Sequence, residues 1–419
     1  MKAIIEIFIL ELRKLIRSKT VFMLLLAASA WMLIFPNLAK ADGTTQGTRE
    51  IIIHYSLGGV FILLAVAILA SSSGSLAKER AAKRLQLTMV RPARYALIAL
   101  GSILAHTVAA AFVMLVAFLL LAPRIDLSTP CSHVTKPIMP STQEEARAMY
   151  DIYMADTNTP VAVREAKKSV VLRLLANRAV DRYETIGTNE VGRWRFHMPD
   201  NTEGLAVRMR FTNQLDMRQD LLGEFRLGTL GASISNITQA VLTIPLKNRV
   251  QASTNEVGTL EFFNKGVSAV MLRPRKDIEL LHPADEFWKN MFRAYLECIA
   301  IFALLAAFGT VLSASLGRSV AIFVAFVALA VSEMSPSVVK QYPDELEKNA
   351  LDRAGLYIAR FTADFTRPIS SLSPIGKLAK DECVEYSEVG NILLADLIIL
   401  PTVLSLLAAL GIARKEEDI

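Results

Sequence analysis

The 419-residue chain has few cysteines, few charged residues and no phosphate-binding loop. Three cysteines are too few for a disulfide framework or a four-ligand zinc site. Charged residues make up only 21% of the chain and hydrophobic residues 53%, a balance that soluble domains rarely show. The motif Gly-x-x-x-x-Gly-Lys-Ser/Thr is absent, as are His-Glu-x-x-His and Gly-x-Ser-x-Gly. We therefore expect no enzymatic activity, no metal site and no ATP site on this chain.

Long apolar runs without Lys or Arg are the main feature that is present. A helix needs about 20 mostly apolar residues to cross the hydrocarbon core of a membrane. Six runs satisfy this requirement, at residues 21–39, 51–72, 95–122, 294–316, 320–338 and 389–413. The predicted fold class is a mainly α-helical integral membrane protein with six transmembrane helices plus an extracytoplasmic α+β domain containing a β-sandwich.

The Lys and Arg residues indicate the orientation, because short cytoplasmic loops carry an excess of them. Basic residues precede the first run and fill the segment between the second and third runs, and Arg318 stands between the fourth and fifth. Both termini are therefore predicted to be cytoplasmic, in the plasma membrane, which for a bacterium is the cytoplasmic (inner) membrane. The net charge of +6 then reflects topology, and we expect no nucleic-acid partner.

The first 20 residues have apolar positions at helical spacing with charges between them, which predicts an amphipathic elbow helix in the inner membrane interface. An alternative is a signal peptide cleaved near Ala39-Lys40-Ala41, a small-x-small sequence. Cleavage would remove the first span and invert every later loop against the charge rule. We therefore favour the retained elbow helix.

About 160 residues of soluble composition follow the third run. Residues 141–184 predict two helices, broken near Asn158-Thr159-Pro160, and residues 190–283 predict a β-sandwich of short strands, as in the alternation of Leu205, Val207 and Met209 with polar neighbours. The predicted organisation is an elbow helix (1–20), membrane helices (21–122) with a cytoplasmic loop (73–94), an extracytoplasmic domain (123–286), membrane helices (287–338), an outer loop with an interfacial helix (339–388), a last membrane helix (389–413) and a cytoplasmic tail (414–419).

Two segments resemble the membrane subunit of ABC-2-type (type V) ABC transporters, in particular the branch called multicopper-enzyme-maturation permeases. One is Leu10-Glu11-Leu12-Arg13-Lys14, similar to the family's elbow before the first span, and the other runs from Lys78-Glu79-Arg80 to Arg91-Pro92-Ala93-Arg94, similar to its cytoplasmic coupling loop. Lys83-Arg84 stand where the family usually has Gly-Thr, and a large domain after the third span is not usual there. The resemblance implies ATPase-coupling roles for Glu11, Arg13, Lys78, Glu79, Arg80, Lys83, Arg84, Leu87, Arg91 and Pro92.

That family membership would make the chain an export permease driven by a separate ABC ATPase subunit, which would carry the ATP and Mg. It implies a homodimer or heterodimer of permeases in contact with membrane lipid, and the outer domain would have an extracytoplasmic ligand whose identity is unknown. The alternative is a membrane-anchored extracytoplasmic binding or signalling protein without transport. Six spans exceed what anchoring needs, and this favours the permease.

Polar residues inside the runs are candidate functional groups because charges are costly in a membrane. Asp396 and His106 either serve a transport pathway or are neutralised by packing partners, while Glu297 and Glu333 lie near span ends and are expected to reach toward the interface. Cys131 and Cys383 both fall on the predicted outer side, where an oxidising compartment would let them pair if their Cα atoms lie within about 7 Å. Cys298 is expected to be a packing residue, and Cys131-Ser132-His133 offers too few ligands to define a copper site.

Overall fold

The computed structural model describes residues 2–38, 45–81, 95–127, 129–156, 160, 164, 166–199, 203–210, 212–213, 221–228, 230–237, 241–248, 257–341, 355, 357 and 373–417. The chain divides into two compact units. The helical unit takes in Met1–Cys131, Glu286–Gln341 and the described part of Asn349–Ile419, and the strand unit takes in Ser132–Asp285. The predicted interfacial helix of the 339–388 loop, expected at residues 344–365, falls almost wholly outside the described residues.

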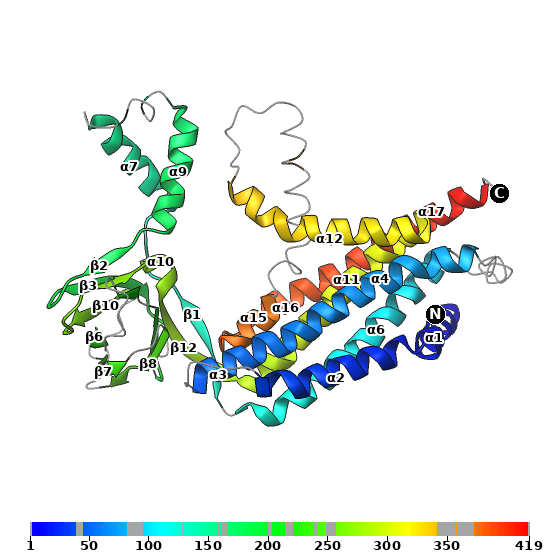
Figure 1. The fold of residues 1–419 in the computed structure, drawn as a ribbon, viewed down its shortest axis with the longest axis horizontal. Helices are drawn as coiled ribbons and strands as arrows, with labels where there is room; N and C mark the ends of the chain where they lie inside the picture. The colour runs from blue at the N-terminus through cyan, green and yellow to red at the C-terminus, as the bar shows by residue number, and fades with distance from the viewer. Residues whose placement is uncertain are drawn as a thin grey trace. The chain divides into compact units, whose positions relative to one another are not determined.

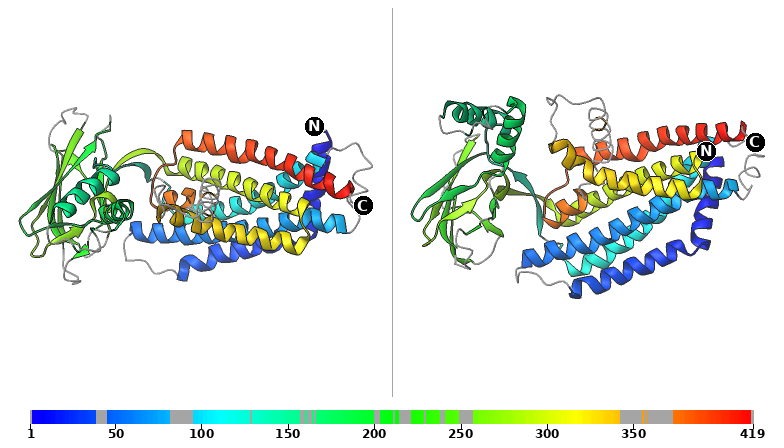
Figure 2. Two further views of the ribbon diagram at one scale, coloured as in Figure 1. Left: turned by 90° about the horizontal axis from the view of Figure 1, so that it is seen from above. Right: turned by 45° about the horizontal axis from the view of Figure 1, so that its top comes forward.

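The helical unit is a set of long helices lying side by side, with a short helix at one end running across them (Figures 1 and 2). Its elements are α1 (Lys2–Arg17), α2 (Thr20–Leu38), α3 (Thr45–Ile51), the π-helix η1 (Ile52–Leu57), α4 (Gly58–Ala81), α6 (Tyr95–Leu121), the 3-10 turn η2 (Ala122–Arg124), α11 (Phe287–Ser315), α12 (Arg318–Gln341), α15 (Ser373–Ala379), α16 (Tyr386–Ile392), the π-helix η3 (Leu393–Ile399) and α17 (Leu400–Glu417).

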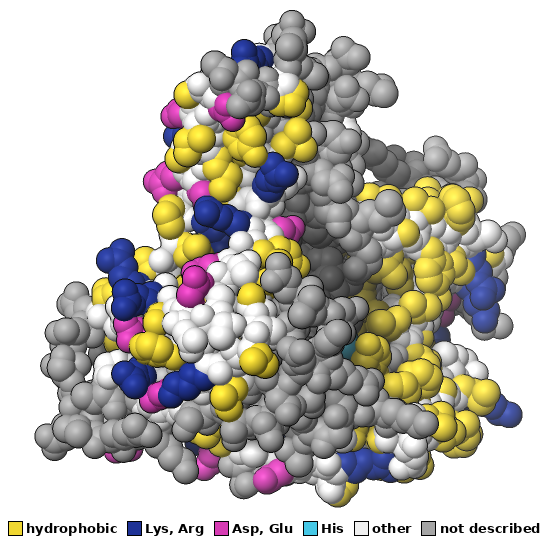
Figure 3. Space-filling view, turned by 60° about the vertical axis from the view of Figure 1, so that its left-hand side comes forward, with side chains coloured by type: hydrophobic (Ala, Val, Ile, Leu, Met, Phe, Trp, Pro, Cys, Tyr) yellow, Lys and Arg dark blue, Asp and Glu magenta, His cyan; other side chains and the backbone are white. Residues whose placement is uncertain are grey.

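Five continuous helical segments of the described chain are long and apolar enough to cross a membrane, and the chain is a membrane protein. They are Thr20–Leu38, Gly47–Ala81, Tyr95–Arg124, Phe287–Ser315 and Tyr386–Ala413. The predicted run at 320–338 falls on α12, whose described apolar part, Arg318–Val331, is shorter. In the space-filling view the described surface of the helices is largely apolar, as expected for a surface that faces lipid (Figure 3).

The extent to which each helix is buried shows which helices lie at the centre of the unit and which lie at its edge. In α11, 72% of the most apolar window is buried, against 11% in α2, so α11 is the central helix of the unit and α2 a peripheral one. The buried residues of α11 include many small ones, and two of its rings pair with rings of neighbouring helices: Phe302 with Phe61 of α4 at 5.4 Å between centroids, and Tyr295 with Phe118 of α6 at 5.7 Å. A Cβ added to Gly309 would lie 2.0 Å from Ser72 Oγ, so only glycine permits this approach of α11 to α4.

A sharp corner separates α1 from α2. Lys19 has a φ of 60°, in the left-handed region, and the Ser18 amide still donates to the Lys14 carbonyl at 2.9 Å. This ends α1 after one last turn and starts α2 in a new direction. Figure 2 shows α1 running across the axis of α2. The amphipathic stretch predicted at the N terminus is therefore a separate helix.

The strand unit contains three sheets in its described part, with strand orders β1-β12-β4-β8, β3-β10-β6-β7-β9 and β2-β11-β5, and strands β12, β4 and β8 and all strands of the other two sheets pair antiparallel. The strands are β1 (Pro130–Thr135), β2 (Glu184–Ile186), β3 (Val191–His197), β4 (Ala206–Arg210), β5 (Thr212–Asn213), β6 (Leu221–Leu227), β7 (Leu230–Ile237), β8 (Val241–Pro245), β9 (Lys247–Asn248), β10 (Val257–Asn264), β11 (Val270–Leu272) and β12 (Ile278–Glu286). A one-turn helix, α10 (Pro274–Asp277), precedes β12.

The alternation seen in the sequence sets the faces of these strands. Val207 and Met209 of β4 are fully buried, in one hydrophobic cluster with Phe196, Phe225 and Phe262 of the five-stranded sheet. On β4 the alternate residue Arg208 faces its cross-strand partner Glu279, with Arg208 Nε donating to Glu279 Oε2 at 2.7 Å. A shift of one residue would exchange apolar and charged faces, so this pair and the apolar core both fix the register.

Two helices accompany the sheets, as the sequence predicted for 141–184. They are α7 (Thr142–Ala155) and α9 (Lys168–Val180), which pack through Ala146, Val171 and Leu175. Ser141 starts α7 with a capping box, because its hydroxyl accepts from the Glu144 amide and the Glu144 carboxylate accepts from the Ser141 amide.

Candidate functional site

Two helices, α1 and α4, meet around one lysine at the end of the helical unit where α1 lies, which we call the elbow end. Lys14 of α1 donates from Nζ to Glu11 Oε1 at 2.7 Å and also to the carboxylate of Glu79, near the last residue of α4. Glu11 is only 6% exposed. The Lys14 ammonium group is therefore shared by two carboxylates, that of Glu11, 3 residues away in the sequence, and that of Glu79, 65 residues away.

The next residue of α4 connects it to α11. Arg80 donates to the carbonyl of Ala314 at 2.7 Å and to that of Leu316 at 3.0 Å. The last carbonyls of a helix lack partners within the helix and carry the negative end of its dipole. Arg80 thus caps α11 from a neighbouring helix, and the Ala77 amide adds a bond to Ser313 Oγ at 2.9 Å.

A small apolar cluster lies beside these polar contacts. It joins five helices, α1, α4, α6, α11 and α17, through Ile7, Leu76, Ile98, Ala99, Ala314, Ala408 and Ile412. The α1 helix approaches α6 so closely that a Cβ on Gly101 would lie 2.6 Å from Ile7 Cγ2. The amphipathic α1 helix is therefore fixed to the helices that carry the predicted loop.

The electrostatics of the lysine and its two acids are coupled. Burial raises the pKa of Glu11 above its usual value, the charge of Glu79 raises it further, and Lys14 only partly offsets the two effects. Burial alone would lower the pKa of Lys14, but its hydrogen bonds to Glu11 and Glu79 outweigh burial and raise that pKa. Lys14 therefore stays charged, and Glu11 takes up a proton more readily than an ordinary glutamate does.

The structure separates the predicted coupling residues into three sets. Glu11, Glu79 and Arg80 make contacts within the protein, whereas Arg13 and Lys78 are exposed on α1 and α4. Lys83, Arg84, Leu87, Arg91 and Pro92 lie outside the described residues. Lys14, which the sequence-based set of coupling residues omitted, is the residue that joins two of its members. Its position at i+3 from Glu11 was the available signal.

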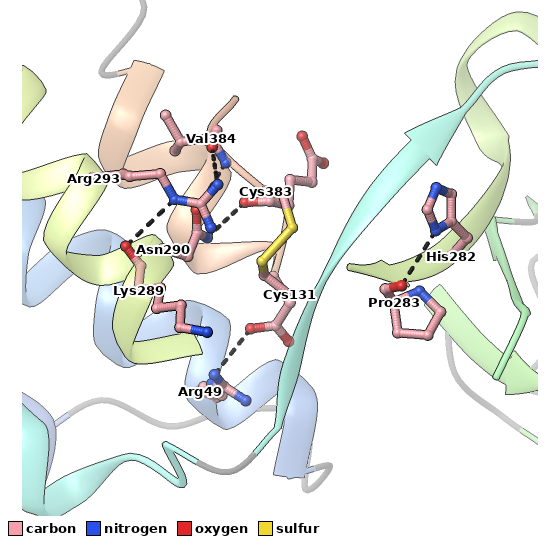
Figure 4. The surroundings of a disulfide bond; sticks show 11 residues. Arg49, Cys131, His282, Pro283, Lys289, Asn290, Arg293, Cys383 and Val384 are labelled. Atoms are coloured by element: carbon pink, nitrogen blue, oxygen red, sulfur yellow. Dashed lines mark hydrogen bonds and ion pairs between the residues drawn. A yellow bond between two sulfur atoms is a disulfide. The ribbon is translucent and has the colours of Figure 1, made fainter. Parts of the chain in front are cut away.

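The opposite end of the helical unit, which we call the disulfide end, is held differently (Figure 4). Cys131 and Cys383 form a disulfide with Cα atoms 5.2 Å apart, the pairing that the sequence left open. Because its sulfur is bonded to Cys383, Cys131 has no thiolate to offer a copper ion. Beside the disulfide, Arg49 pairs with Asp381 at 3.2 Å, lies over the Phe287 ring at 4.1 Å from its centroid and bonds to Thr129.

Two side chains of α11 complete the disulfide end by bonding to backbone groups around Cys383. Asn290 donates to the Glu382 carbonyl and accepts from the Val384 amide, both at 2.8 Å. Arg293 donates to the Val384 carbonyl at 2.7 Å and lies over the Tyr386 ring. The polar turn from Phe287 to Arg293 precedes the apolar run predicted at 294–316, is also helical and uses its polar groups at these contacts.

The polar residues within the spans have separate environments. His106 is buried on α6, its Nδ1 lies 2.8 Å from the Ser102 carbonyl, and its Nε2 has no hydrogen-bond partner. It lines a cavity of about 20 Å³ together with Leu15, Val21, Leu64 and Ser71, which is room for one water. Asp396 is 6% exposed on the π-helix η3.

The expectation that Glu297 reaches toward the interface is wrong. Its side chain is buried on α11, with 1% exposure, and both carboxylate oxygens lack a hydrogen-bond partner. The physical reason is that α11 starts seven residues before the predicted run and is covered by α15 and α16 at this level. The side chain of Glu333 lies outside the described residues, and Cys298 is a buried free thiol.

No family model matches the chain, and neither the curated proteins nor the solved structures give a significant match. Across the described ranges, no group of three or more His, Cys, Asp or Glu side chains is placed to hold a metal ion. A functional assignment therefore depends on the residues and geometry of the elbow end and of the spans.

Proposed function

We propose that the chain is the membrane-spanning permease subunit of an ATP-binding-cassette exporter of the ABC-2 type, driven by a separate ATPase subunit. The observation that carries this proposal is the elbow end, where the amphipathic helix α1 and the last turn of α4, which lies within the predicted cytoplasmic segment 73–94, are bound to each other. In this proposal the elbow end and both termini are cytoplasmic, and the plasma membrane is the site of function. The ATP and Mg belong to the partner.

The elbow end offers a path by which movement of a partner would reach the centre of the bundle. A displacement of α1 would be transmitted to α4 through the contact between Lys14 and Glu79. It would then reach the C-terminal end of α11 through the hydrogen bonds that Arg80 donates to the carbonyls there. Since α11 is the most deeply buried span, a shift of its end changes its packing against the surrounding helices. Coupling then takes the form of a rigid-body shift of helices, one of the known switching movements.

A sixth crossing by α12 is part of this proposal. The α11 helix ends at the elbow end, where Arg80 caps it, while α16 starts at the disulfide end, where Tyr386 lies against Arg293. The chain between them must therefore return across the unit. The α12 helix packs on α4 and α11, and its 24 residues span about 36 Å, enough for the hydrocarbon core.

We place the strand unit and the disulfide end outside the cytoplasm. Disulfides persist in oxidising compartments and are rare in the cytosol, so the Cys131–Cys383 bond supports this side. Because the four- and five-stranded sheets share one hydrophobic cluster, we assign the strand unit a β-sandwich fold. Its extracytoplasmic ligand and the exported substrate are not specified by any described contact.

Site-directed photo-crosslinking in native membranes tests the proposal. A photoreactive residue replaces Arg13 or Lys78, which are exposed at the elbow end, and in a matched control it replaces Lys289 at the disulfide end. We expect Arg13 and Lys78, but not Lys289, to crosslink a polypeptide whose peptides contain a Gly-x-x-x-x-Gly-Lys-Ser/Thr motif. We also expect Lys78→Glu to reduce ATP hydrolysis by the co-purified complex. If only Lys289 crosslinks a partner, the membrane-anchored binding protein is the better assignment.

A further inference from the structure

Glu297 is a buried carboxyl group within a membrane-spanning helix and has no use in the proposal above. It lies ten residues after the start of α11, is 1% exposed, and neither of its oxygens accepts a hydrogen bond. An ionised carboxylate is costly in such a place unless it is paired, since neither water nor a donor replaces its hydration. A bound proton removes that cost without any change in the surrounding structure.

The groups around Glu297 give that proton an exit. The helices α4, α6, α12 and α17 and the π-helix η3 pack on α11, but among the described residues the charges that act on Glu297 come from α15 and α16. They are Lys377 and Glu388, which pair at 2.5 Å and are each about one-third exposed. On α11 itself, Arg293 donates a hydrogen bond to the Val384 carbonyl, and Cys298 is a buried free cysteine.

We propose that Glu297 is an intramembrane proton-binding site that exchanges protons with the compartment at the disulfide end through the Lys377–Glu388 pair. In the first arrangement, the Lys377–Glu388 ion pair is the one that the structure contains, and the Glu297 carboxyl holds the proton. To reach the second arrangement, the side chains of Glu297 and Glu388 must first move within hydrogen-bond distance. The O–H bond at Glu297 then breaks as a Glu388 oxygen takes the proton, and the Lys377 ammonium moves to the Glu297 carboxylate. Both arrangements carry the same net charge, so the exchange leaves no uncompensated charge in the membrane.

The exchange depends on Lys377 having two alternative partners. A lysine has three donors on a flexible stem and moves readily between neighbouring carboxylates. Glu388 lies in the first turn of α16, with a third of its side chain exposed, so a proton on it reaches water directly. This assignment uses only α11, α15 and α16 and does not depend on an ATPase partner, so it can fail without affecting the proposed transport function.

Infrared difference spectroscopy of the full-length chain in lipid nanodiscs tests the proposal. At neutral pH the native protein should show the C=O band of a protonated carboxylic acid that shifts on exchange into D2O. The band should disappear in Glu297→Gln and persist in Glu385→Gln, a matched change at an exposed carboxylate next to α16. If the folded Glu297→Gln protein keeps every carboxylic acid band of the native protein, the proposal is overturned.

A second variant keeps the test valid if Glu297→Gln does not fold. Lys377→Gln removes the cation that stabilises the ionised form of Glu297. Because an opposite charge changes proton affinity by about tenfold or more, the band should persist to a pH about one unit higher. Glu388→Gln should slow the D2O shift, since it removes the proton's exit. A band whose titration and exchange are both unchanged in these variants contradicts the role of the pair.

Discussion

The same helices are held in different ways at their two ends. At the disulfide end, α11 is bound to the segment around Cys383 by buried side chains that contact backbone groups, next to a covalent bond. At the elbow end, α4 is bound to α1 by an ion pair through Lys14, whose side chain is 40% exposed. Ion pairs that water reaches contribute little and rearrange easily. From this comparison we propose that α4 and α11 pivot about the disulfide end and move at the elbow end, where Arg80 and the apolar cluster around Ile7 would move with them.

Reduction of the disulfide is expected to lower the stability of the protein more than any of the other changes below. Reduction of Cys131–Cys383 opens a link between residues 252 apart and should lower the free energy of unfolding by about 2–5 kcal/mol. Thermal unfolding in detergent with and without reductant measures this, and Cys298→Ser is the control because Cys298 is free. A melting temperature that does not respond to reductant in the native protein would mean that the disulfide end is not held by this bond.

Asn290 should have the next largest effect. Asn290→Ala removes one hydrogen-bond partner from the Glu382 carbonyl and one from the Val384 amide, and the loss of these part-buried and buried hydrogen bonds should cost about 3 kcal/mol. Asn391→Ala, at an exposed asparagine of α16, is the matched control and should unfold like the native protein. Equal melting temperatures for the two variants would contradict the buried contact.

Glu79→Gln should affect stability less than either change at the disulfide end. Lys14 keeps Glu11 as a partner, so the expected loss is about 1 kcal/mol, within the range for partly exposed pairs. Lys78→Gln, at the exposed neighbouring position, should leave the unfolding temperature unchanged. If Glu79→Gln lowers the unfolding temperature as much as Asn290→Ala does, the two ends of the helical unit are equally rigid, and the proposal that α4 and α11 pivot about the disulfide end is wrong.

The smallest effect concerns pH. The pKa of Glu11 is raised in the folded protein, so the folded state binds its proton more tightly than the unfolded state does. Its contribution to stability is present below the ordinary value of 4.5 and is lost as pH rises from there through the raised pKa. Glu11→Gln should remove this loss, and Glu79→Gln should reduce it. The free energy of unfolding, measured from pH 4 to pH 8, should therefore fall less steeply with pH in both variants than in the native protein. A steeper fall in Glu11→Gln would contradict the predicted direction of the pH dependence.

Local patterns in the sequence predicted much of the helical unit. The apolar runs gave five spans that the structure contains, and the spacing of charged and apolar residues gave α1 as a helix before the first span. In the strand unit, the alternation around Val207 and Met209 gave a strand with its buried face in the correct phase. These features depend on neighbours in the sequence, which is why they are readable from it.

The remaining features depend on contacts between distant residues. Asn290 and Arg293 made the start of α11 look too polar for a membrane helix, because their partners at 382–384 are more than 90 residues away. The burial of Glu297 depends on α15 and α16 in the same way. The sequence marked Cys131 and Cys383 as a possible pair but not their distance, and it left Lys14 as one basic residue among many.

The most direct test of the account is the side of the membrane on which each region lies. Val267, 88% exposed in the strand unit, and Lys78, exposed at the elbow end, are replaced by cysteine one at a time and treated with a membrane-impermeant maleimide. We predict that intact cells label Val267→Cys at once and Lys78→Cys only after the membrane is opened. Labelling of both variants in intact cells, or of Lys78→Cys alone, would contradict the account.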